Sequence, residues 1–417
     1  MALSSGYFLV FFNRVAPNVL APDLTRDFNL GAAQLGLLGS LYFWPYALLQ
    51  IPAGIALGRV GARRLASAGL VLAAFGSALL ALAPFFGVAL LGRGLVGAGS
   101  TPFFISLQLT IRHWFRRDQF ATMAGLMQMV ANLGGLVATR PLAALAEGVG
   151  WRQSLILLSL AMLLAAAVVF LLVRNRPEYV GLPPVGEALA PDVAERLPLR
   201  QTLRIAWGLP SVWLLAAVLF LILGTINAFQ GLWAVPFLID TRGMERSGAA
   251  GLVAWWAWGT VFGAPSWGLL SDRVLHTRKG TALLGFALFA LAWTPLTLIP
   301  AVPSEWLVPL MFLAGFGAGS SVVSSPMLME LLPRQVVGAA IGLTNATPFL
   351  GAAVYQYGIG LALDAFGRRP SGAYPIEGYQ AVFGFCLLSL VGAFLLMSSV
   401  RERARHQPAT TTSVTNP

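Results

Sequence analysis

Apolar runs of about 20 residues recur along the whole chain, separated by short polar segments. A helix of ~20 residues is long enough to cross the hydrocarbon core of a bilayer. Because lipid offers no hydrogen-bond partners, a spanning segment must satisfy its own backbone, which leaves helices or closed barrels. Only 10% of the residues are charged, against about 25% in soluble domains. The sequence therefore predicts an all-α membrane protein.

The apolar runs predict twelve transmembrane helices, at residues 4–23, 33–57, 65–84, 87–110, 119–146, 152–173, 211–236, 249–271, 280–300, 306–328, 337–363 and 379–400. The longest polar stretch, 174–209, lies between the sixth and seventh of these and predicts a cytoplasmic linker. It divides the chain into an N-terminal half, 1–173, and a C-terminal half, 210–400, each of six helices. The tail 401–417 is predicted to be disordered and cytoplasmic.

Arginine and lysine in the loops predict the orientation, because cytoplasmic loops carry an excess of both. With the N-terminus inside, 18 of these residues fall in inner segments and 6 in outer ones. Both termini are therefore predicted to be cytoplasmic. Arginine outnumbers lysine 26 to 1, which together with abundant alanine and glycine indicates a bacterial protein. We expect a multi-pass protein of the bacterial inner membrane.

The charge and the reactive side chains exclude several classes of protein. The net charge of +11 is spread over short loops, so no basic face for nucleic acid is predicted. A single cysteine, Cys386, excludes disulfides and a cysteine-based metal site. No nucleophile–base pair and no metal-ligand cluster is found, so we expect no enzyme and no cofactor.

Three arginines, Arg14, Arg93 and Arg140, lie inside predicted spans, whereas all sixteen acidic residues fall at helix ends or in loops. A charge at the bilayer centre costs about 2.5–3.5 kcal/mol on the insertion scale. Without carboxylate partners, these charges predict a water-filled cavity that binds an anion.

The two halves repeat each other at three places. Gly-Ala-Gly-Ser occurs at 97–100 and again at 317–320, residues 124–135 resemble 341–352, and residues 54–64 resemble 268–279. The offsets of 220, 217 and 214 residues agree. Parallel repeats around a central binding site are a known transporter architecture.

Over essentially the whole chain, these features resemble the major facilitator superfamily. The loop after the second span matches that family's signature with Gly54, Arg59, Gly61, Arg63 and Arg64, except that Gly58 replaces the usual acid. The second copy keeps the acid, as Asp272-Arg273. The fourth span resembles the family's arginine–glycine motif, with Arg93 in the arginine position. The resemblance implies a twelve-helix transporter in which this loop locks the halves together, so Arg59, Arg63, Asp272 and Arg273 are predicted gating residues.

The resemblance also implies which helices face the central cavity: 1, 4, 7 and 10, helped by 2, 5, 8 and 11. Helical spacing aligns polar and aromatic residues on these helices. Tyr7, Phe11, Arg14 and Asn18 share one face of the first, and Tyr42, Tyr46 and Gln50 one face of the second. The predicted substrate-binding residues are Arg14, Asn18, Tyr42, Tyr46, Arg93, Gln128, Asn132, Arg140, Asn227, Gln230, Asn345 and Gln356.

A guanidinium group binds carboxylate through a bidentate fork. We therefore predict a monomeric secondary transporter that moves a small organic anion, a mono- or dicarboxylate, across the membrane by alternating access. Two segments, 11–24 and 41–54, resemble bacterial carriers of organic anions or nitrate, although the arginines that nitrate carriers use in the second and eighth spans are absent. An exporter of drugs or amphipathic metabolites, a nitrate or nitrite carrier, and a non-transporting receptor remain open as alternatives.

Overall fold

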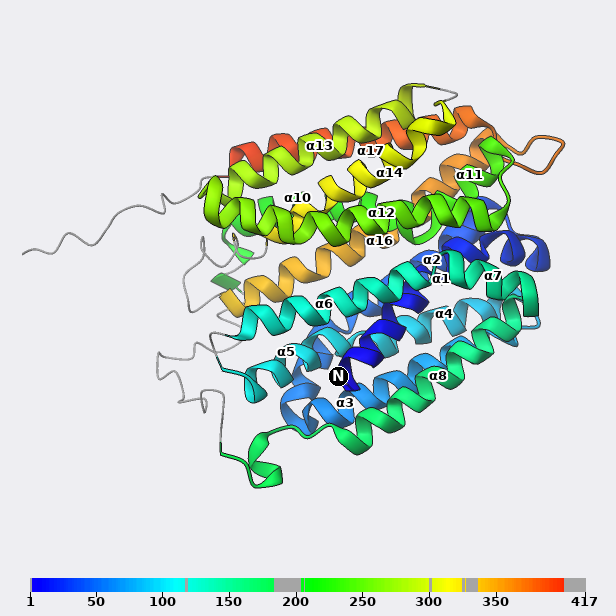
Figure 1. The fold of residues 1–417 in the computed structure, drawn as a ribbon. Coiled ribbons are helices and arrows are strands. Elements are labelled where there is room, and N and C mark those ends of the chain that lie inside the picture. Colours follow the sequence, from blue (N-terminus) through cyan, green and yellow to red (C-terminus); the bar gives the residue numbers. More distant parts are fainter. Residues whose placement is uncertain are drawn as a thin grey trace, which may run out of the picture.

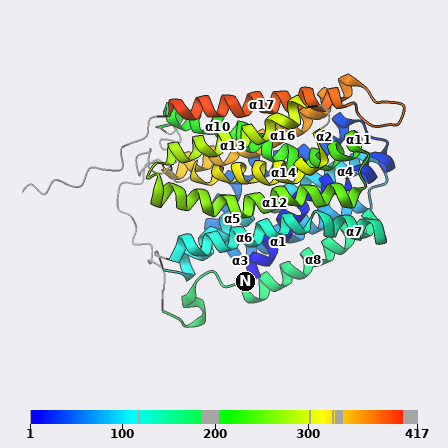
Figure 2. The same ribbon diagram turned by 45° about the horizontal axis from the view of Figure 1, so that its top comes forward.

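The computed structural model describes residues 2–116, 119–183, 204–205, 207–299, 302–324, 327 and 337–400. Long helices make up most of them and run roughly side by side in Figures 1 and 2. The N-terminal half contains α1 (Ala2–Phe28), α2 (Ala32–Leu48), α3 (Gln50–Ala81), α4 (Phe86–Ser100), α5 (Pro102–Trp114), α6 (Phe120–Val137), α7 (Arg140–Val149) and α8 (Trp151–Leu172).

The C-terminal half contains α10 (Pro210–Ala228), the π-helix η3 (Phe229–Trp233), α11 (Ala234–Arg242), α12 (Arg246–Leu269), the π-helix η4 (Leu270–Val274), α13 (Arg278–Leu298), α14 (Ser304–Ala318), the 3-10 helix η5 (Gly319–Val323), α16 (Val337–Phe366) and α17 (Ile376–Ser399). Between the halves, the short 3-10 helix η2 (Pro177–Val180) follows α8. We call the end of the bundle at which α8 ends and α10 begins the linker end. The other end is called the opposite end.

The predicted all-α architecture of two helical halves is confirmed, with each predicted span matched by one helix or by consecutive elements. Among the described residues, eight segments are long and apolar enough to cross a membrane, and the pair Gly125–Val137 and Arg140–Val149, bent by 41°, would be a ninth. The predicted spans outside this set correspond to α1, α2 and α12. These three helices line the space between the halves, so they carry more polar and small residues. Residues 184–203 of the predicted linker and the tail 401–417 lie outside the described part of the chain.

Prolines account for several of the breaks within spans. Pro102 begins α5 directly after α4, and the π-helix η3 is followed by Pro236. Proline has no N–H to donate to the carbonyl four residues earlier, so it bends or interrupts a helix. A π-turn in mid-span is also common at functional sites. The chain is therefore irregular in the last third of the seventh predicted span, next to the site described below.

Gly61 separates the second and third predicted spans, although one helical element, α3, runs across it. Its φ of 78° is a left-handed conformation, which glycine adopts without steric cost. A Cβ at this position would also lie 2.3 Å from Nδ2 of Asn175. This glycine belongs to the loop signature, and the turn it makes brings that loop against the end of α8.

The two halves meet most closely where α2 packs along α16. Small residues let the two backbones approach, as is common between membrane helices. A Cβ on Gly36 would lie 2.4 Å from the carbonyl oxygen of Gln356, and one on Gly360 would lie 2.3 Å from that of Ala32. The contact between halves is therefore formed by backbone against backbone at these positions.

Close packing within the N-terminal half gives a first prediction. A Cβ on Gly97 of α4 would lie 2.0 Å from the carbonyl oxygen of Tyr42 in α2. We expect Gly97→Ala to lower the melting temperature of the purified protein, since overpacking costs about 1–3 kcal/mol. Gly94→Ala is the matched control, because its nearest neighbouring atom is 3.9 Å away and the gain in helix propensity is the same. Equal melting temperatures for the two variants would contradict this.

Candidate substrate site

A cavity of about 360 Å³ lies between the two halves, near the lower end of the ~300–1,000 Å³ range of small-molecule sites. Helices α1, α2, α3, α5 and α6 of the N-terminal half contribute to it, as do α10, η3, α12, α14, η5 and α16 of the other half. The polar residues that line it are Tyr7, Arg14, Tyr46, Gln50, Gln128, Asn132, Asn227, Gln230, Thr260 and Ser321. Arg14 carries the one formal charge among the described lining residues, which include no carboxylate.

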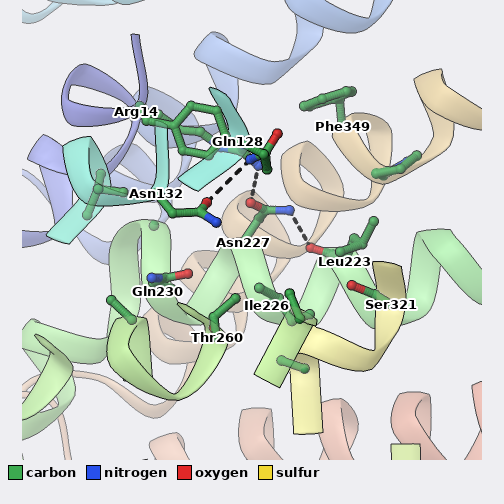
Figure 3. A pocket seen from close by; sticks show the side chains of 18 of the residues that line it. Arg14, Gln128, Asn132, Leu223, Ile226, Asn227, Gln230, Thr260, Ser321 and Phe349 are labelled. Carbon is green, nitrogen blue, oxygen red and sulfur yellow. Dashed lines mark hydrogen bonds between the residues drawn. The ribbon is translucent and has the colours of Figure 1, made fainter. Parts of the chain in front are cut away.

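Arg14 is held at the cavity by groups from both halves. Its guanidinium carbon lies 5.4 Å from the ring centre of Phe11, 5.2 Å from that of Phe43 and 5.5 Å from that of Phe349. Ring faces attract a cation within about 6 Å. The guanidinium also donates a hydrogen bond to the side-chain oxygen of Asn227, as Figure 3 shows. A neutral amide oxygen thus occupies one donor of Arg14 and leaves its positive charge without an anionic partner.

An amide-rich wall stands beside Arg14 on α1 and α6. The hydroxyl of Tyr7 donates to Gln128 at 3.4 Å. The Gln128 amide donates to Asn132 at 3.3 Å, as Figure 3 shows. Both amides line the cavity. Because amide groups both donate and accept hydrogen bonds, this wall suits a ligand that carries hydroxyl groups.

Toward the opposite end, hydrogen bonds between the halves close the cavity. The Asn18 amide donates to the carbonyl of Gln230 at 2.7 Å, and its oxygen accepts from the N–H of Val235 at 2.9 Å. Within the C-terminal half, the Gln356 amide donates to the carbonyl of Asn227 at 3.0 Å. These bonds reach the backbone around the π-helix η3, where regular helical pairing is interrupted. Asn18 and Gln356 are fully buried and form the floor of the site.

Arg93 is sealed away from the cavity. Its exposed fraction is 1%, and its guanidinium donates to the backbone carbonyls of Asn13 and Arg14 at 2.9 and 3.2 Å. Tyr42 covers it, with 4.8 Å between the guanidinium carbon and the ring centre. From the sequence, the charge of Arg93 is expected to need an anion. In the structure, the backbone carbonyls of α1 stabilise it instead.

The structure brings half of the predicted substrate-binding residues to the cavity wall: Arg14, Tyr46, Gln128, Asn132, Asn227 and Gln230. Asn18, Tyr42, Arg93 and Gln356 are buried next to it. Arg140 is exposed at the start of α7, and the side chain of Asn345 lies outside the described residues. Substrate contact remains a prediction for all of them.

The predicted set omitted several lining residues. Tyr7, Phe11 and Gln50 lie on the aligned faces of the first two spans, so helical spacing does point to them. Thr260 and Phe349 stand alone between apolar residues, and Ser321 belongs to a serine-rich run, 320–325, that does not single it out.

The predicted gating residues lie at the linker end, where Arg59 and Arg273 are exposed. Arg63 stacks on Phe170, 4.4 Å from its ring centre, and its backbone N–H donates to Asn175 at 2.9 Å. Asp272 forms an ion pair with Arg278 at 2.8 Å. Each of these contacts joins residues of the same half, and a gating role for the four remains a prediction.

The halves are joined at the opposite end by polar contacts that the sequence did not reveal. The carboxylate of Asp364, near the end of α16, accepts hydrogen bonds from the N–H groups of Ala32 and Ala33, both at 2.8 Å. These are the first residues of α2, where helix N–H groups lack partners and favour a negative charge. Tyr374 donates to the same carboxylate and accepts from Ala32 N–H at 2.7 Å. Burial and the bond to Asp364 raise the pKa of Tyr374, so its hydroxyl keeps its proton at neutral pH.

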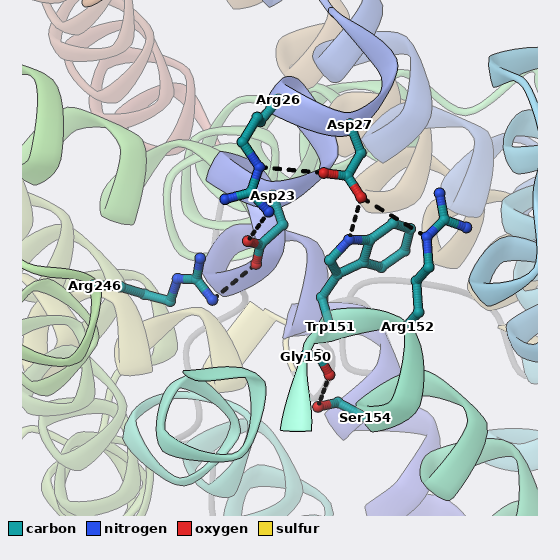
Figure 4. Close-up of polar contacts among 8 residues, drawn as sticks. All are labelled: Asp23, Arg26, Asp27, Gly150, Trp151, Arg152, Ser154 and Arg246. Atoms are coloured by element: carbon teal, nitrogen blue, oxygen red, sulfur yellow. Dashed lines mark hydrogen bonds and ion pairs between the residues drawn. The ribbon is translucent and has the colours of Figure 1, made fainter. Parts of the chain in front are cut away.

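A second contact between the halves lies near the end of α1. Asp23 accepts from Arg26 of its own helix at 3.2 Å and pairs with Arg246, at the start of α12, at 2.8 Å (Figure 4). Asp27 pairs with Arg152 and accepts from the Trp151 indole within the N-terminal half. Asp23 and Asp27 thus lie near the end of a helix, as predicted for the acidic residues.

The cavity faces the linker end of the bundle. Tyr7 lies near the start of α1, Gln50 at the start of α3 and Ser321 in η5, all on the linker side of Arg14. The contacts of Asn18, Asp364 and Asp23 lie on the other side. The site is thus lined by residues of both halves and is closed toward the opposite end of the bundle.

The comparisons with known proteins agree on the family. The family model of the Major Facilitator Superfamily matches residues 3–254 and 227–416. The membrane sensor protein UhpC of Salmonella typhimurium is 26% identical over 384 residues, covering 86% of this chain and 83% of that protein. The hexuronate transporter of Bacillus subtilis is 26% identical over 399 residues, covering 89% of each.

Two further similarities bear on function and fold. A probable hexose phosphate transport protein of Chlamydia pneumoniae is 23% identical over 385 residues, covering 87% of this chain and 84% of that protein. The crystal structure of a bacterial homolog of the human lysosomal transporter Spinster superposes with a TM-score of 0.76 at 19% identity, covering 95% of this chain and 96% of that one.

Proposed function

The chain belongs to the major facilitator superfamily, and from this membership and the cavity we propose that it carries a small organic anion, a hydroxylated carboxylate, across a membrane. The family and the similar transporters make a secondary transporter the coarse assignment. The finer assignment, to carboxylates, is our proposal. The name of the similar Bacillus protein, a hexuronate transporter, supplies the size and chemistry of a first candidate.

The observation that carries this proposal is Arg14. It lines the cavity, and no carboxylate stands among the described lining residues. A cation at this depth in a membrane-spanning bundle is costly without an anionic partner, and a bound anion would neutralise it. A carboxylate that replaces the Asn227 oxygen would accept both arms of the guanidinium fork. The Asn227 oxygen, which accepts from Arg14, therefore marks the place that we assign to a substrate oxygen.

The wall of Tyr7, Gln128 and Asn132 supports a hydroxylated body on the substrate. A site built to hydrogen-bond hydroxyl groups rejects analogues that lack them, because its own polar groups are then left unpaired. Gln230 and Thr260 face the same space from the other half. A ligand bound between these walls would touch both halves, as alternating access requires.

The contacts between the halves support a rocking mechanism. In the structure the opposite end is closed, and the cavity faces the linker end. With the predicted orientation, in the bacterial inner membrane with both termini in the cytoplasm, this is the state open to the cytoplasm. The described lining residues include neither carboxylate nor histidine that could relay protons. Exchange for a second anion, movement down a gradient, or a proton carried on the substrate's own carboxylate are the coupling schemes that fit.

A sensor is the second candidate function, because the chain is as similar to a membrane sensor protein as to a hexuronate transporter. A sensor would bind the ligand without carrying it. A phosphate ester carries about −1.5 to −2 charges at neutral pH. Arg14 is the one charged residue among the described lining residues and matches the single negative charge of a carboxylate better, so we rank carboxylates above sugar phosphates as substrates. Exporters of drugs and nitrate carriers remain lesser alternatives.

Uptake into proteoliposomes tests the proposal. Purified protein is reconstituted and offered labelled D-glucuronate, glucose 6-phosphate, nitrate or a hydrophobic cation, with binding followed in parallel by thermal stabilisation. Saturable uptake of D-glucuronate that unlabelled hexuronates inhibit is the expected result. Binding without uptake would favour the sensor, and preference for phosphate or for the cation would overturn the carboxylate assignment.

A further inference from the structure

The first helix carries a proline in its interior, one turn beyond Arg14. Pro17 has no N–H, so the carbonyl of Asn13, four residues earlier, loses its helical partner. Within a membrane-spanning segment an unpaired carbonyl is strongly unfavourable. The residue next to that carbonyl in the chain is Arg14, whose side chain reaches the cavity. The defect therefore lies directly beneath the proposed substrate contact.

Arg93 supplies the missing donor from a different helix. One of its terminal nitrogens, Nη1, lies 2.9 Å from the carbonyl oxygen of Asn13 and 3.3 Å from the oxygen of its side chain. The other, Nη2, lies 3.2 Å from the carbonyl oxygen of Arg14. Two successive carbonyls are thus bridged by the two arms of one guanidinium. Lysine could not reproduce this, because its ammonium is a single point and not a planar fork.

The surroundings of Arg93 fix it in this role. It is almost fully buried, does not line the cavity, and is covered by Tyr42. Its direct partners all belong to residues 13 and 14 of α1, apart from the ring of Tyr42. What Arg93 controls is therefore the backbone of the turn from which Arg14 projects.

We propose that Arg93 is a positioning residue: it bridges the carbonyl of Asn13, freed by Pro17, to the next carbonyl and so holds the turn of α1 that aims Arg14 at the substrate. This inference rests on the proposed function only in naming Arg14 as the substrate contact. The coupling between Arg93 and Pro17 follows from the geometry alone. Arg93 acts through the backbone of Arg14 and does not itself touch the ligand.

A double-mutant cycle tests this proposal. Pro17→Ala restores an N–H at position 17, so the carbonyl of Asn13 can be paired within the helix. Arg93→Lys keeps the positive charge but removes the fork. We expect Arg93→Lys to weaken D-glucuronate binding roughly tenfold, a coupling typical of residues in one hydrogen-bond network. Pro17→Ala combined with Arg93→Lys is expected to recover most of that loss, although the second arm to Arg14 stays unmade.

A second readout does not depend on the substrate. Cys386 is the one cysteine of the sequence, so a Cys386→Ala background allows a single reporter, Asn132→Cys, in the cavity wall. The ratio of its labelling rates with anionic and cationic methanethiosulfonate reagents reports the positive potential that Arg14 creates. Arg14→Gln should lower this ratio and sets the scale. Arg93→Lys should lower the ratio of labelling rates partly. Adding Pro17→Ala to Arg93→Lys should restore that ratio.

The outcomes separate the possible roles. If Arg93 contacted the substrate itself, adding Pro17→Ala would not rescue binding. If its role were only structural, the melting temperature would fall while the labelling ratio and the affinity of the folded protein stayed unchanged. Either result would overturn the inference. Failure of the wild-type protein to bind D-glucuronate, together with the expected labelling ratios, would reject the proposed substrate and keep the positioning role.

Discussion

Replacing Arg14 by glutamine is expected to abolish measurable uptake of the carried anion. Arg14 is the charged residue of the described cavity lining, and truncating one member of a buried, hydrogen-bonded charge pair costs about 2–5 kcal/mol. That corresponds to roughly 30- to 4,000-fold weaker binding. Glutamine keeps hydrogen-bonding capacity and much of the side-chain length. The loss of affinity therefore reflects the missing charge and not a cavity left by a shorter side chain. Affinity is measured by uptake at graded substrate concentrations and by binding to the purified protein.

Two companion variants sharpen the Arg14 experiment. Arg14→Lys keeps the charge but loses the fork, so we expect binding intermediate between the wild type and Arg14→Gln. Arg204→Gln is the matched control, because Arg204 is an exposed arginine just before α10. Uptake by Arg14→Gln equal to that of Arg204→Gln would remove Arg14 from the substrate site. Neither Arg14→Lys nor Arg204→Gln is expected to change the amount of folded protein greatly.

Replacing Asp364 by asparagine is expected to open the opposite end of the bundle. The carboxylate caps the start of α2 with two hydrogen bonds at 2.8 Å, and hydrogen bonds to charged groups contribute about 1.5–3 kcal/mol. These hydrogen bonds form only in the conformation in which the halves are together at this end. Losing them therefore destabilises that conformation alone and shifts the equilibrium toward the separated one. We expect a shift of about 10- to 150-fold toward conformations that are separated there. Tyr374→Phe, which removes one donor to Asp364, should act in the same direction but less strongly.

Distances between spin labels measure the Asp364 effect. In a Cys386→Ala background, labels at Glu147 and Glu305 report the separation of the halves, because both side chains are exposed at the opposite end. The Asp364→Asn variant should show a larger population of long distances. Glu377→Gln is the control, since Glu377 pairs at 3.3 Å with Arg369 of its own half. An unchanged distribution in Asp364→Asn, or the same change in Glu377→Gln, would contradict a role of Asp364 in holding the halves together at this end.

Much of the fold follows from the sequence for reasons that are local. The length and apolarity of each run determine that it forms a helix in lipid, and these properties need no knowledge of neighbouring segments. Some of the helix breaks can also be predicted from the sequence, because Pro102 and Pro236 lack the backbone N–H that a regular helix needs. The extent of α3 is less readable, since the sharp turn at Gly61 depends on a single backbone angle.

The site was predictable where a helix face repeats. Arg14 was identified because it lies in an apolar span with aligned polar neighbours, and Gln128 and Asn132 for the same reason. Thr260 was missed because one small polar residue in a span has no periodic signal, and Ser321 because the serine-rich run around it, 320–325, does not distinguish one face. Their place in the cavity depends on the packing of α12 and η5 against the other half.

The sequence by itself determined a twelve-helix membrane protein with uncompensated arginines at depth, because hydropathy and charge are properties of each segment. Only the tertiary structure decided which arginine is free to meet an anion. Arg14 and Arg93 both lie inside predicted spans, yet Arg14 faces a cavity, whereas Arg93 faces the backbone carbonyl of Asn13 that Pro17 frees. The physical reason is that a charge is satisfied by whatever dipoles packing places beside it. Those dipoles come from helices far apart in the chain.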